Sequence, residues 1–303
     1  MNVHTRPVDS EEAFWQVRAF LVDTEPIAPP SHNWEVRRWE GRFFYAPCPG
    51  WSKSWRAQMW LTPDGCVVAA VHPEGRGDAH IQIHPDYRHL EPELVAWAEE
   101  HLAHEDDAGR RTLSIPVLAY DARRRQVLQE RGFVETEQGG VVRHLRLGRQ
   151  ALVQPDIAPG YTIRATNPEN PRVCQGIADI LNAAYNRTFH TAAEYQTFAR
   201  LAPSFRAGLD FVATAPDGTI AAYVGVPYEP HNRLAVFEPV CTHPDHQRRG
   251  LAKALMQHAL LALRRHGAQR VVVGTGDMIP ANRLYDSIGF TEAYREQEWR
   301  LDL

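Results

Sequence analysis

Residues 240–255 read VCTHPDHQRRGLAKAL, a stretch that predicts a strand, a tight polar turn and the start of a helix. At a helix start, several backbone N–H groups have no intrahelical partner, and the helix dipole adds partial positive charge. Gln247, Arg248 and Arg249 stand just before that start, and Gly250 allows a ligand to approach the backbone closely. This combination is typical of a phosphate-binding turn. We therefore expect this stretch to hold a diphosphate.

Three landmarks recur in both halves of the chain, in the same order and at nearly the same offset. They are His-Pro-Asp at 84–86 and 243–245, Gly-Phe at 132–133 and 289–290, and Pro-Asp-Gly at 63–65 and 216–218. Each half predicts a strand, helices, three strands, a helix, a strand, a helix and two short final strands. This order favours an α/β (α+β) fold, with a mixed, largely antiparallel sheet flanked by helices. We expect two tandem domains, 1–150 and 151–303, joined by a proline-containing linker at 148–160.

Composition restricts the partners of the chain. The 303 residues are 44% hydrophobic and 23% charged, with a formal net charge of −4, as expected for a globular protein that does not bind nucleic acid. No apolar run approaches the 18 residues of a membrane span, and the N-terminus lacks the apolar segment of a signal peptide. The four cysteines are far apart in the sequence, which suits free thiols in a reducing compartment. We expect a cytoplasmic protein with no membrane partner.

The second half resembles the GNAT N-acetyltransferase superfamily, and the first half resembles it through the internal repeat. The motifs are Gln247-x-x-Gly250-x-Ala252 after a strand, Asn282-x-x-Tyr285, and Gly289-Phe290. In plan, the chain is similar to the tandem-domain members. The resemblance implies an N-acetyltransferase that moves an acetyl group from acetyl-coenzyme A to a primary amine of a small molecule, by direct transfer in a ternary complex. Two alternatives stay open: a protein or peptide N-acetyltransferase, and a non-catalytic acyl-coenzyme A sensor.

The resemblance also implies a set of cofactor-binding residues. The set is Val240, Cys241, Thr242, Gln247, Arg248, Arg249, Gly250, Leu251, Ala252 and Asn282. Backbone groups of Val240 and Thr242 would pair with the pantetheine arm like an extra strand, and Asn282 would bond the pantetheine region. A backbone N–H near Val240 or Cys241 would face the developing oxyanion.

Two residues are candidates for the proton transfers. Tyr285 follows Asn282 by three positions, on the same helix face, and is the candidate acid for the leaving thiolate. Glu238 stands two residues before Val240 on the same strand face and is the candidate base. The alternatives are packing for Tyr285 and an exposed edge position for Glu238. Cys241 as an acyl-carrying nucleophile is less favoured, because no His–Asp pair is evident beside it.

Acceptor and metal assignments rest on weaker patterns. Tyr185, Asn186 and His190 lie where such folds place their acceptor-binding helices, although a polar helix face with core aromatics would look the same. His243 and Asp245 are expected to belong to the turn, and we expect no metal.

The first half departs from the motifs at the decisive positions. Aligning the His-Pro-Asp turns puts Glu91 in the place of Gly250, and aligning the Gly-Phe pairs puts Leu128 in the place of Tyr285. A carboxylate at the glycine position repels a diphosphate. We therefore expect the domain at 1–150 to be degenerate and non-catalytic.

Overall fold

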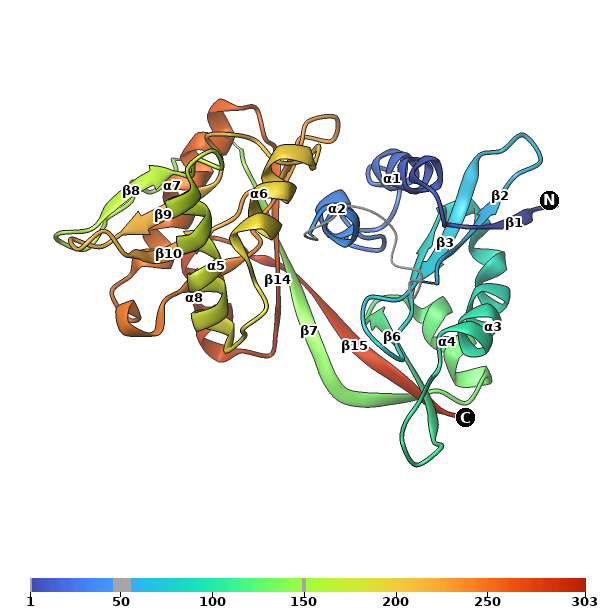
Figure 1. Ribbon diagram of the computed structural model, residues 1–303. Helices are drawn as coiled ribbons and strands as arrows, with labels where there is room; N and C mark the ends of the chain where they lie inside the picture. Colours follow the sequence, from blue (N-terminus) through green and yellow to red (C-terminus); the bar gives the residue numbers. More distant parts are fainter. Residues whose placement is uncertain (1, 46–55, 149–150) are drawn as a thin grey trace. The chain divides into compact units, whose positions relative to one another are not determined.

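The computed structural model describes residues 2–45, 56–148 and 151–303, which form two compact units (Figure 1). Unit 1 comprises Met1–Trp39, Gly50–Val142 and Tyr294–Leu303, and unit 2 comprises Glu40–Pro49 and Arg143–Ala293. The α/β class with two similar halves is confirmed. Among the described residues, no helix is both long and apolar enough to cross a membrane. Residues 149–150 of the predicted linker lie outside the described residues, and 151–161 contain no helix or strand.

Unit 1 contains an antiparallel sheet in the order β1-β2-β3-β4, and the neighbouring strands β15 (Glu292–Asp302), β6 and β5. Its elements are β1 (His4–Pro7), α1 (Glu11–Thr24), β2 (Gln58–Leu61), β3 (Val67–His72), β4 (His80–Ile83), α3 (Glu91–His101), β5 (His104–Glu105), β6 (Arg111–Leu118) and α4 (Ala122–Glu130). The Ser10 hydroxyl caps α1 by accepting from the N–H of Ala13, and α3 buries Leu94, Val95 and Ala98 in the core. Helix α2 (Val36–Phe44) is divided between the units after Trp39.

Unit 2 contains the antiparallel sheet β13-β10-β9-β8, and the neighbouring strands β11, β12, β14 and β7 (Val134–Arg146). Its elements are β8 (Thr162–Ala165), α5 (Pro171–Tyr185), α6 (Ala192–Leu201), β9 (Phe211–Thr214), β10 (Ile220–Val224), β11 (Tyr228–Glu229), β12 (Leu234–Val236), β13 (Val240–Thr242), α7 (Leu251–Arg265), β14 (Arg270–Gly276) and α8 (Ile279–Ile288). Helix α7 buries its apolar stripe, Leu251, Leu255 and Ala259, in the core of this unit.

Each half of the chain ends in one long strand, where the sequence predicted two short ones. These strands are β7 (Val134–Arg146) and β15 (Glu292–Asp302), drawn in green and red in Figure 1. Gly139 belongs to β7 without a turn, and a Cβ there would lie 2.4 Å from the carbonyl oxygen of Glu296. The glycine therefore allows the backbones of β7 and β15 to approach each other closely.

The long strands also change which residues belong to each unit. β15 pairs antiparallel with β6, with Trp299 opposite Ile115, and Trp299 is buried in the core of unit 1. The C-terminal segment therefore completes unit 1, and Arg143–Arg146 of β7 belong to unit 2. The contiguous domains predicted at 1–150 and 151–303 differ from the units in these segments, because an alternating pattern does not specify which sheet a strand joins.

Candidate functional site

Strand β13 forms the edge of its sheet because the chain changes partners just before it. β12 pairs in parallel with β14, with Val236 opposite Val272. After Phe237, the chain leaves β14, and Glu238 and Pro239 bond to Gly225. β13 then pairs antiparallel with β10, with Cys241 opposite Tyr223. β12 and β13 are consecutive in the chain yet belong to different sheets, so β13 has no neighbouring strand on its second side among the described residues.

Alternate residues of β13 bond to β10, and the backbone groups of the residues between them face the side without a neighbouring strand. Bonds to β10 fall on the odd-numbered residues, since the N–H of His243 donates to the carbonyl of Ala221 at 2.9 Å. Antiparallel pairs alternate, so Cys241 also bonds to β10, while the N–H and C=O groups of Val240 and Thr242 face the opposite way. These are the groups that the resemblance assigned to the pantetheine arm.

Gly225 makes the change of partner possible. A Cβ on this residue would lie 2.5 Å from the carbonyl oxygen of Glu238, a backbone atom that cannot move aside cheaply. Gly225 was not among the residues predicted from the sequence, although a glycine at the end of an apolar strand is a signal for close backbone approach.

The Cys241 side chain does not lie on the open edge. It packs in a core cluster with Ile177 and Tyr195, and burial raises the pKa of its thiol to about 12. The thiol therefore stays protonated at neutral pH, which disfavours a covalent acyl route through Cys241. Because the backbone of Cys241 bonds to β10, the N–H of Val240 is the better placed of the two candidates for an oxyanion.

The turn after β13 has the backbone geometry of an anion-binding concavity. Arg248 and Gly250 adopt left-handed conformations, with φ of 59° and 72°, and α7 begins at Leu251 without a side-chain cap. The first N–H groups of α7 are thus open to a ligand. A Cβ at Gly250 would have no protein atom within 4 Å, and Gln247, Arg248 and Arg249 are exposed. The structure thus brings the predicted phosphate-binding residues together at one helix start.

The histidines of this turn are engaged within it. His243 accepts through Nδ1 from the N–H of Asp245 at 3.3 Å, and Nδ1 of His246 lies 2.9 Å from the hydroxyl of Tyr161. The guanidinium of Arg249 lies 6.0 Å from the centre of the Tyr161 ring. These contacts fit the predicted structural role of the turn.

Tyr285 lies on α8 with only 5% of its surface exposed, and its ring centre is 6.1 Å from that of Phe290. Burial, reinforced by the charge of Glu238, raises the pKa of Tyr285 to about 12. The phenol is therefore protonated at neutral pH and is suited to donate a proton. Glu238 lies between β12 and β13, whereas the sequence predicted it within the strand of Val240, because the chain changes sheets here.

Asn282 is held by bonds inside the protein. Its amide donates to the carbonyls of Gly276 at 3.2 Å and Met278 at 3.1 Å, and its oxygen accepts from Nε of Arg143 at 2.9 Å. An N–H bond from the Asn282 amide to pantetheine would therefore require one of these bonds to break. Arg143 comes from β7 and also contacts Asp286, and no local pattern indicates a partner 139 residues away.

The predicted acceptor residues lie at the end of α5 and in the loop that follows. The hydroxyl of Tyr185 donates to the carbonyl of Val240 at 3.2 Å, which joins α5 to the open edge of β13. Asn186 ends the helix in a left-handed conformation, with φ of 51°, and His190 pairs with Glu194 at 3.2 Å. Only Tyr185 of the three predicted acceptor residues contacts the edge strand directly.

Known proteins share the segment that contains this open strand edge and uncapped helix. Residues 174–290 match the acetyltransferase (GNAT) family. This segment belongs to that family. A GNAT match indicates acyltransferase activity, and the family uses acetyl-coenzyme A as its co-substrate.

Individual relatives match this chain either over a short segment or at low sequence identity. The chain is 31% identical over 81 residues to streptothricin acetyltransferase from Streptomyces lavendulae, which covers 26% of this chain and 43% of that protein. It thus spans less than half the length of this curated relative. Several solved structures share the fold over 99% of this chain. A GCN5-related N-acetyltransferase from Sphaerobacter thermophilus has 20% identity, a TM-score of 0.66 and 95% of its chain covered. A tandem GNAT protein from the clavulanic acid biosynthesis pathway has 17% identity and a TM-score of 0.67, with 98% of its chain covered.

The corresponding edge strand of unit 1, β4, has its outward backbone groups bonded by side chains of the same unit. The Asn33 amide donates to the carbonyl of Ile83 at 3.1 Å and accepts from its N–H at 2.8 Å. The guanidinium of Arg124 donates to the carbonyl of Ile81 at 3.3 Å. Asn33 thus bonds the backbone groups of Ile83, whose counterparts on Thr242 have no bond among the described residues. The carbonyls of Ile81 and Val240 both accept from a side chain, that of Arg124 in unit 1 and that of Tyr185 in unit 2.

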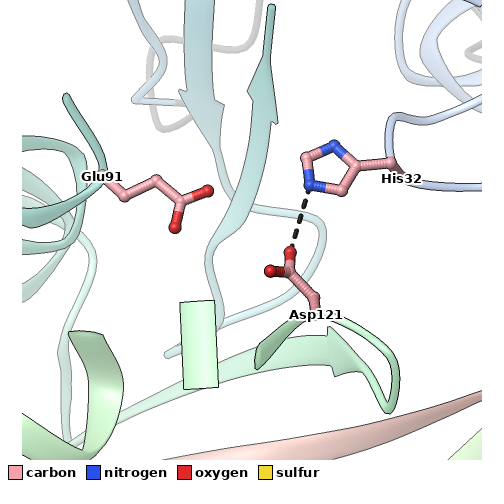
Figure 2. A group of neighbouring side chains, drawn as sticks. All are labelled: His32, Glu91 and Asp121. Atoms are coloured by element: carbon pink, nitrogen blue, oxygen red, sulfur yellow. Dashed lines mark hydrogen bonds and ion pairs between the residues drawn. The ribbon is translucent and has the colours of Figure 1, made fainter. Parts of the chain in front are cut away.

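Behind this strand, charged side chains form a buried network, part of which is drawn in Figure 2. Glu91, which stands at the position of Gly250, is fully buried and accepts from Arg88 at 2.8 Å and from Arg124 at 3.3 Å. Asp121 accepts from Arg88 at 2.5 Å and lies 3.1 Å from Nε2 of His32. Burial lowers the pKa of His32. The bond to Asp121 raises the pKa, and the charges of Arg124 and Arg88 lower it again, so the net shift is downward. The histidine is therefore neutral in this network.

The same three residues, His32, Glu91 and Asp121, have ligand atoms within 4.8 Å of one another, a spacing that a metal ion could use. Arg88 and Arg124 already neutralise both carboxylates, so a divalent cation would meet two positive charges. The chemistry of this donor set thus favours an ion-pair network over a metal centre.

Proposed function

We propose that unit 2 transfers an acetyl group from acetyl-coenzyme A to a primary amine of a small molecule. The observation that carries this proposal is the edge strand β13, which has no neighbouring strand on its second side among the described residues and is followed in the chain by the uncapped start of α7. An extended amide-containing arm suits the edge, and a diphosphate suits the helix start. The partial match to a streptothricin acetyltransferase supports a small-molecule acceptor over a protein one.

Each part of the site has a role in binding the donor. The N–H groups at the start of α7 would bind the diphosphate, with Arg248 and Arg249 adding positive charge. The outward N–H and C=O of Thr242 would bond the pantetheine arm, and the carbonyl of Val240 would bond it on exchanging its present donor, the Tyr185 hydroxyl.

The transfer needs one bond to form and one to break. The lone pair of the amine attacks the thioester carbonyl carbon, and the N–H of Val240 stabilises the negative charge on the oxygen. Glu238 takes the amine proton, directly or through a water molecule. When the C–S bond breaks, Tyr285 gives its phenolic proton to the thiolate, so the acetylated amine and free thiol leave neutral.

We also propose that unit 1 binds no coenzyme A. Glu91 stands at the position of Gly250, and the side chains of Asn33 and Arg124 bond to outward backbone groups of β4. Leu128, at the position of Tyr285, is fully buried in the core and has no proton to give.

Two measurements test these proposals. Labelled acetyl-coenzyme A, incubated with the protein and separate panels of amines and peptides, should label small amines. Label on peptides alone would contradict the acceptor class, and tight donor binding without any transfer would contradict the enzyme assignment in favour of a sensor. Calorimetry should give one coenzyme A per chain, and a stoichiometry of two would contradict the assignment of unit 1.

A further inference from the structure

The loop between α5 and α6 has a well-defined conformation, held mainly by Asn182. The Asn182 side chain donates to the carbonyl of His190 at 2.9 Å and accepts from its N–H at 3.0 Å, while its own carbonyl accepts from the N–H of Arg187 at 2.9 Å. A capping box between Thr191 and Glu194 then starts α6. The side chains of this loop are thus presented on a preorganised backbone.

Arg187 is an exposed cation that lies over two aromatic rings. Its guanidinium carbon is 5.1 Å from the ring centre of Tyr185 and 5.4 Å from that of Phe189. Phe189 is 62% exposed and Tyr185 40%, so both rings keep free surface. Among the described residues no salt bridge includes Arg187, whose polar contact is Nε2 of His190 at 3.5 Å. Ring stacking leaves the in-plane N–H donors of a guanidinium available for a carboxylate or phosphate.

Tyr185 connects this cation to the proposed reaction centre. Its ring contacts Arg187, and its hydroxyl donates to the carbonyl of Val240 on the edge strand. Burial raises the pKa of Tyr185, and the Cys241, Tyr285 and Glu238 groups add to the rise, so the phenol keeps the proton that it donates to Val240. Arg187 is therefore one aromatic ring away from the place where the acetyl group would be transferred.

We infer that the amine acceptor also carries an anionic group, a carboxylate or a phosphate, and that Arg187 binds it. This inference rests on the proposed acetyl transfer. The rings of Tyr185 and Phe189 would contact the body of the acceptor while its amine reaches Glu238. Arg187 is thus a specificity-determining residue that takes no part in the proton transfers.

The experiment measures thiol release with acceptors in matched pairs. Amino acids are paired with their amides, and aminoalkyl phosphates with the corresponding amino alcohols, so that the two anion types are separated. Wild-type protein should prefer the anionic member of at least one pair. Arg187→Gln should raise KM for that member roughly 10- to 100-fold, the loss expected for charged hydrogen bonds, with little change in kcat or for the neutral member. Arg172→Gln, at the opposite end of α5, makes the same charge change and should leave both members unaffected.

Other outcomes separate the inference from the function on which it rests. Equal kcat/KM for anionic and neutral members, or an equal loss on both in Arg187→Gln, would overturn the role of Arg187 and leave acetyl transfer intact. If no amine in the panel releases thiol although acetyl-coenzyme A binds, the proposed transfer itself is overturned.

Discussion

At the scale of single residues, Tyr285 and Asp210 show how burial sets the protonation state of a side chain. Tyr285 is surrounded by the core of unit 2, with Glu238 as a charged neighbour, so its proton is held at neutral pH. Asp210 is a buried carboxyl that immediately precedes β9 of the sheet β13-β10-β9-β8. The two residues lead to different predictions, one on catalysis and one on stability.

We expect Tyr285→Phe to lower kcat by roughly 100-fold or more, the usual contribution of a general acid, with little change in affinity for acetyl-coenzyme A. The ring keeps its packing while the proton donor is lost. Steady-state kinetics combined with calorimetric titration of the donor would measure both. An equal loss of rate and affinity, or no loss, would remove Tyr285 from the acid role.

Asp210 predicts a pH-dependent component of stability. It accepts from the hydroxyls of Tyr195 at 2.9 Å, Tyr223 at 3.1 Å and Thr166 at 3.1 Å, and from the N–H of Val226 at 3.2 Å. Burial outweighs these bonds and raises the pKa of Asp210 from 3.8 to about 6. Between these values the folded state binds more proton than the unfolded state, so the contribution to the free energy of unfolding falls as pH rises.

The expected fall is about 3 kcal/mol between pH values of roughly 4 and 6. It is measured as the difference between wild type and Asp210→Asn in urea unfolding at each pH, since Asn does not titrate. A difference that stays constant, or that grows in favour of wild type as pH rises, would contradict the raised pKa.

At the scale of elements, the edge strand β13 and the uncapped start of α7 follow one another in the chain, joined by the turn at 243–250. The corresponding elements of unit 1 have the same order, but Glu91, Asn33 and Arg124 occupy the equivalent positions. The two units thus differ in the side chains that reach the edge strand more than in the strand itself. This contrast within one chain suggests a direct exchange of residues.

We expect Gly250→Glu, which copies the residue of unit 1, to weaken coenzyme A binding by more than about 100-fold through charge repulsion and loss of the left-handed backbone. Gly218→Glu is a matched control, because Gly218 also has a positive φ, of 89°, and a Cβ there would have no protein atom within 4 Å. Calorimetry on both variants is the measurement. Wild-type affinity in Gly250→Glu would show that the diphosphate binds elsewhere.

At the scale of the whole molecule, the C-terminal segment of the second half completes unit 1. Trp299 is 3% exposed there and is opposite Ile115 across the β15–β6 pair. The stability of unit 1 therefore depends on residues at the far end of the sequence.

We expect Trp299→Ala to destabilise unit 1 by about 3–5 kcal/mol, the usual effect of removing a large buried aromatic side chain. Donor binding by unit 2 should change little, because none of its proposed contacts comes from unit 1. Hydrogen exchange would locate the loss, and calorimetry would follow binding. A loss of protection confined to unit 2 would contradict this assignment.

Local features of the chain were predictable from the sequence because their causes are local. The strand, turn and helix at 240–255 and the role of Gly250 follow from residues close together along the chain, and the repeat follows from comparing short motifs of the two halves. The same patterns indicated the fold class, the cofactor family and the positions of Tyr285 and Glu238.

Only the tertiary structure decided which side chains meet. Asn33 bonds Ile83 across 50 residues, Arg143 holds Asn282 across 139, and the strand that carries Trp299 joins the sheet of the other half. Periodicity specifies that a strand or helix has a buried face and leaves its partner open. The sequence by itself therefore determined where the acetyl donor is expected to bind. The pairing of β15 with β6, and the side-chain bonds of Asn33 and Arg124 to the backbone of β4, depended on contacts between residues far apart in the chain.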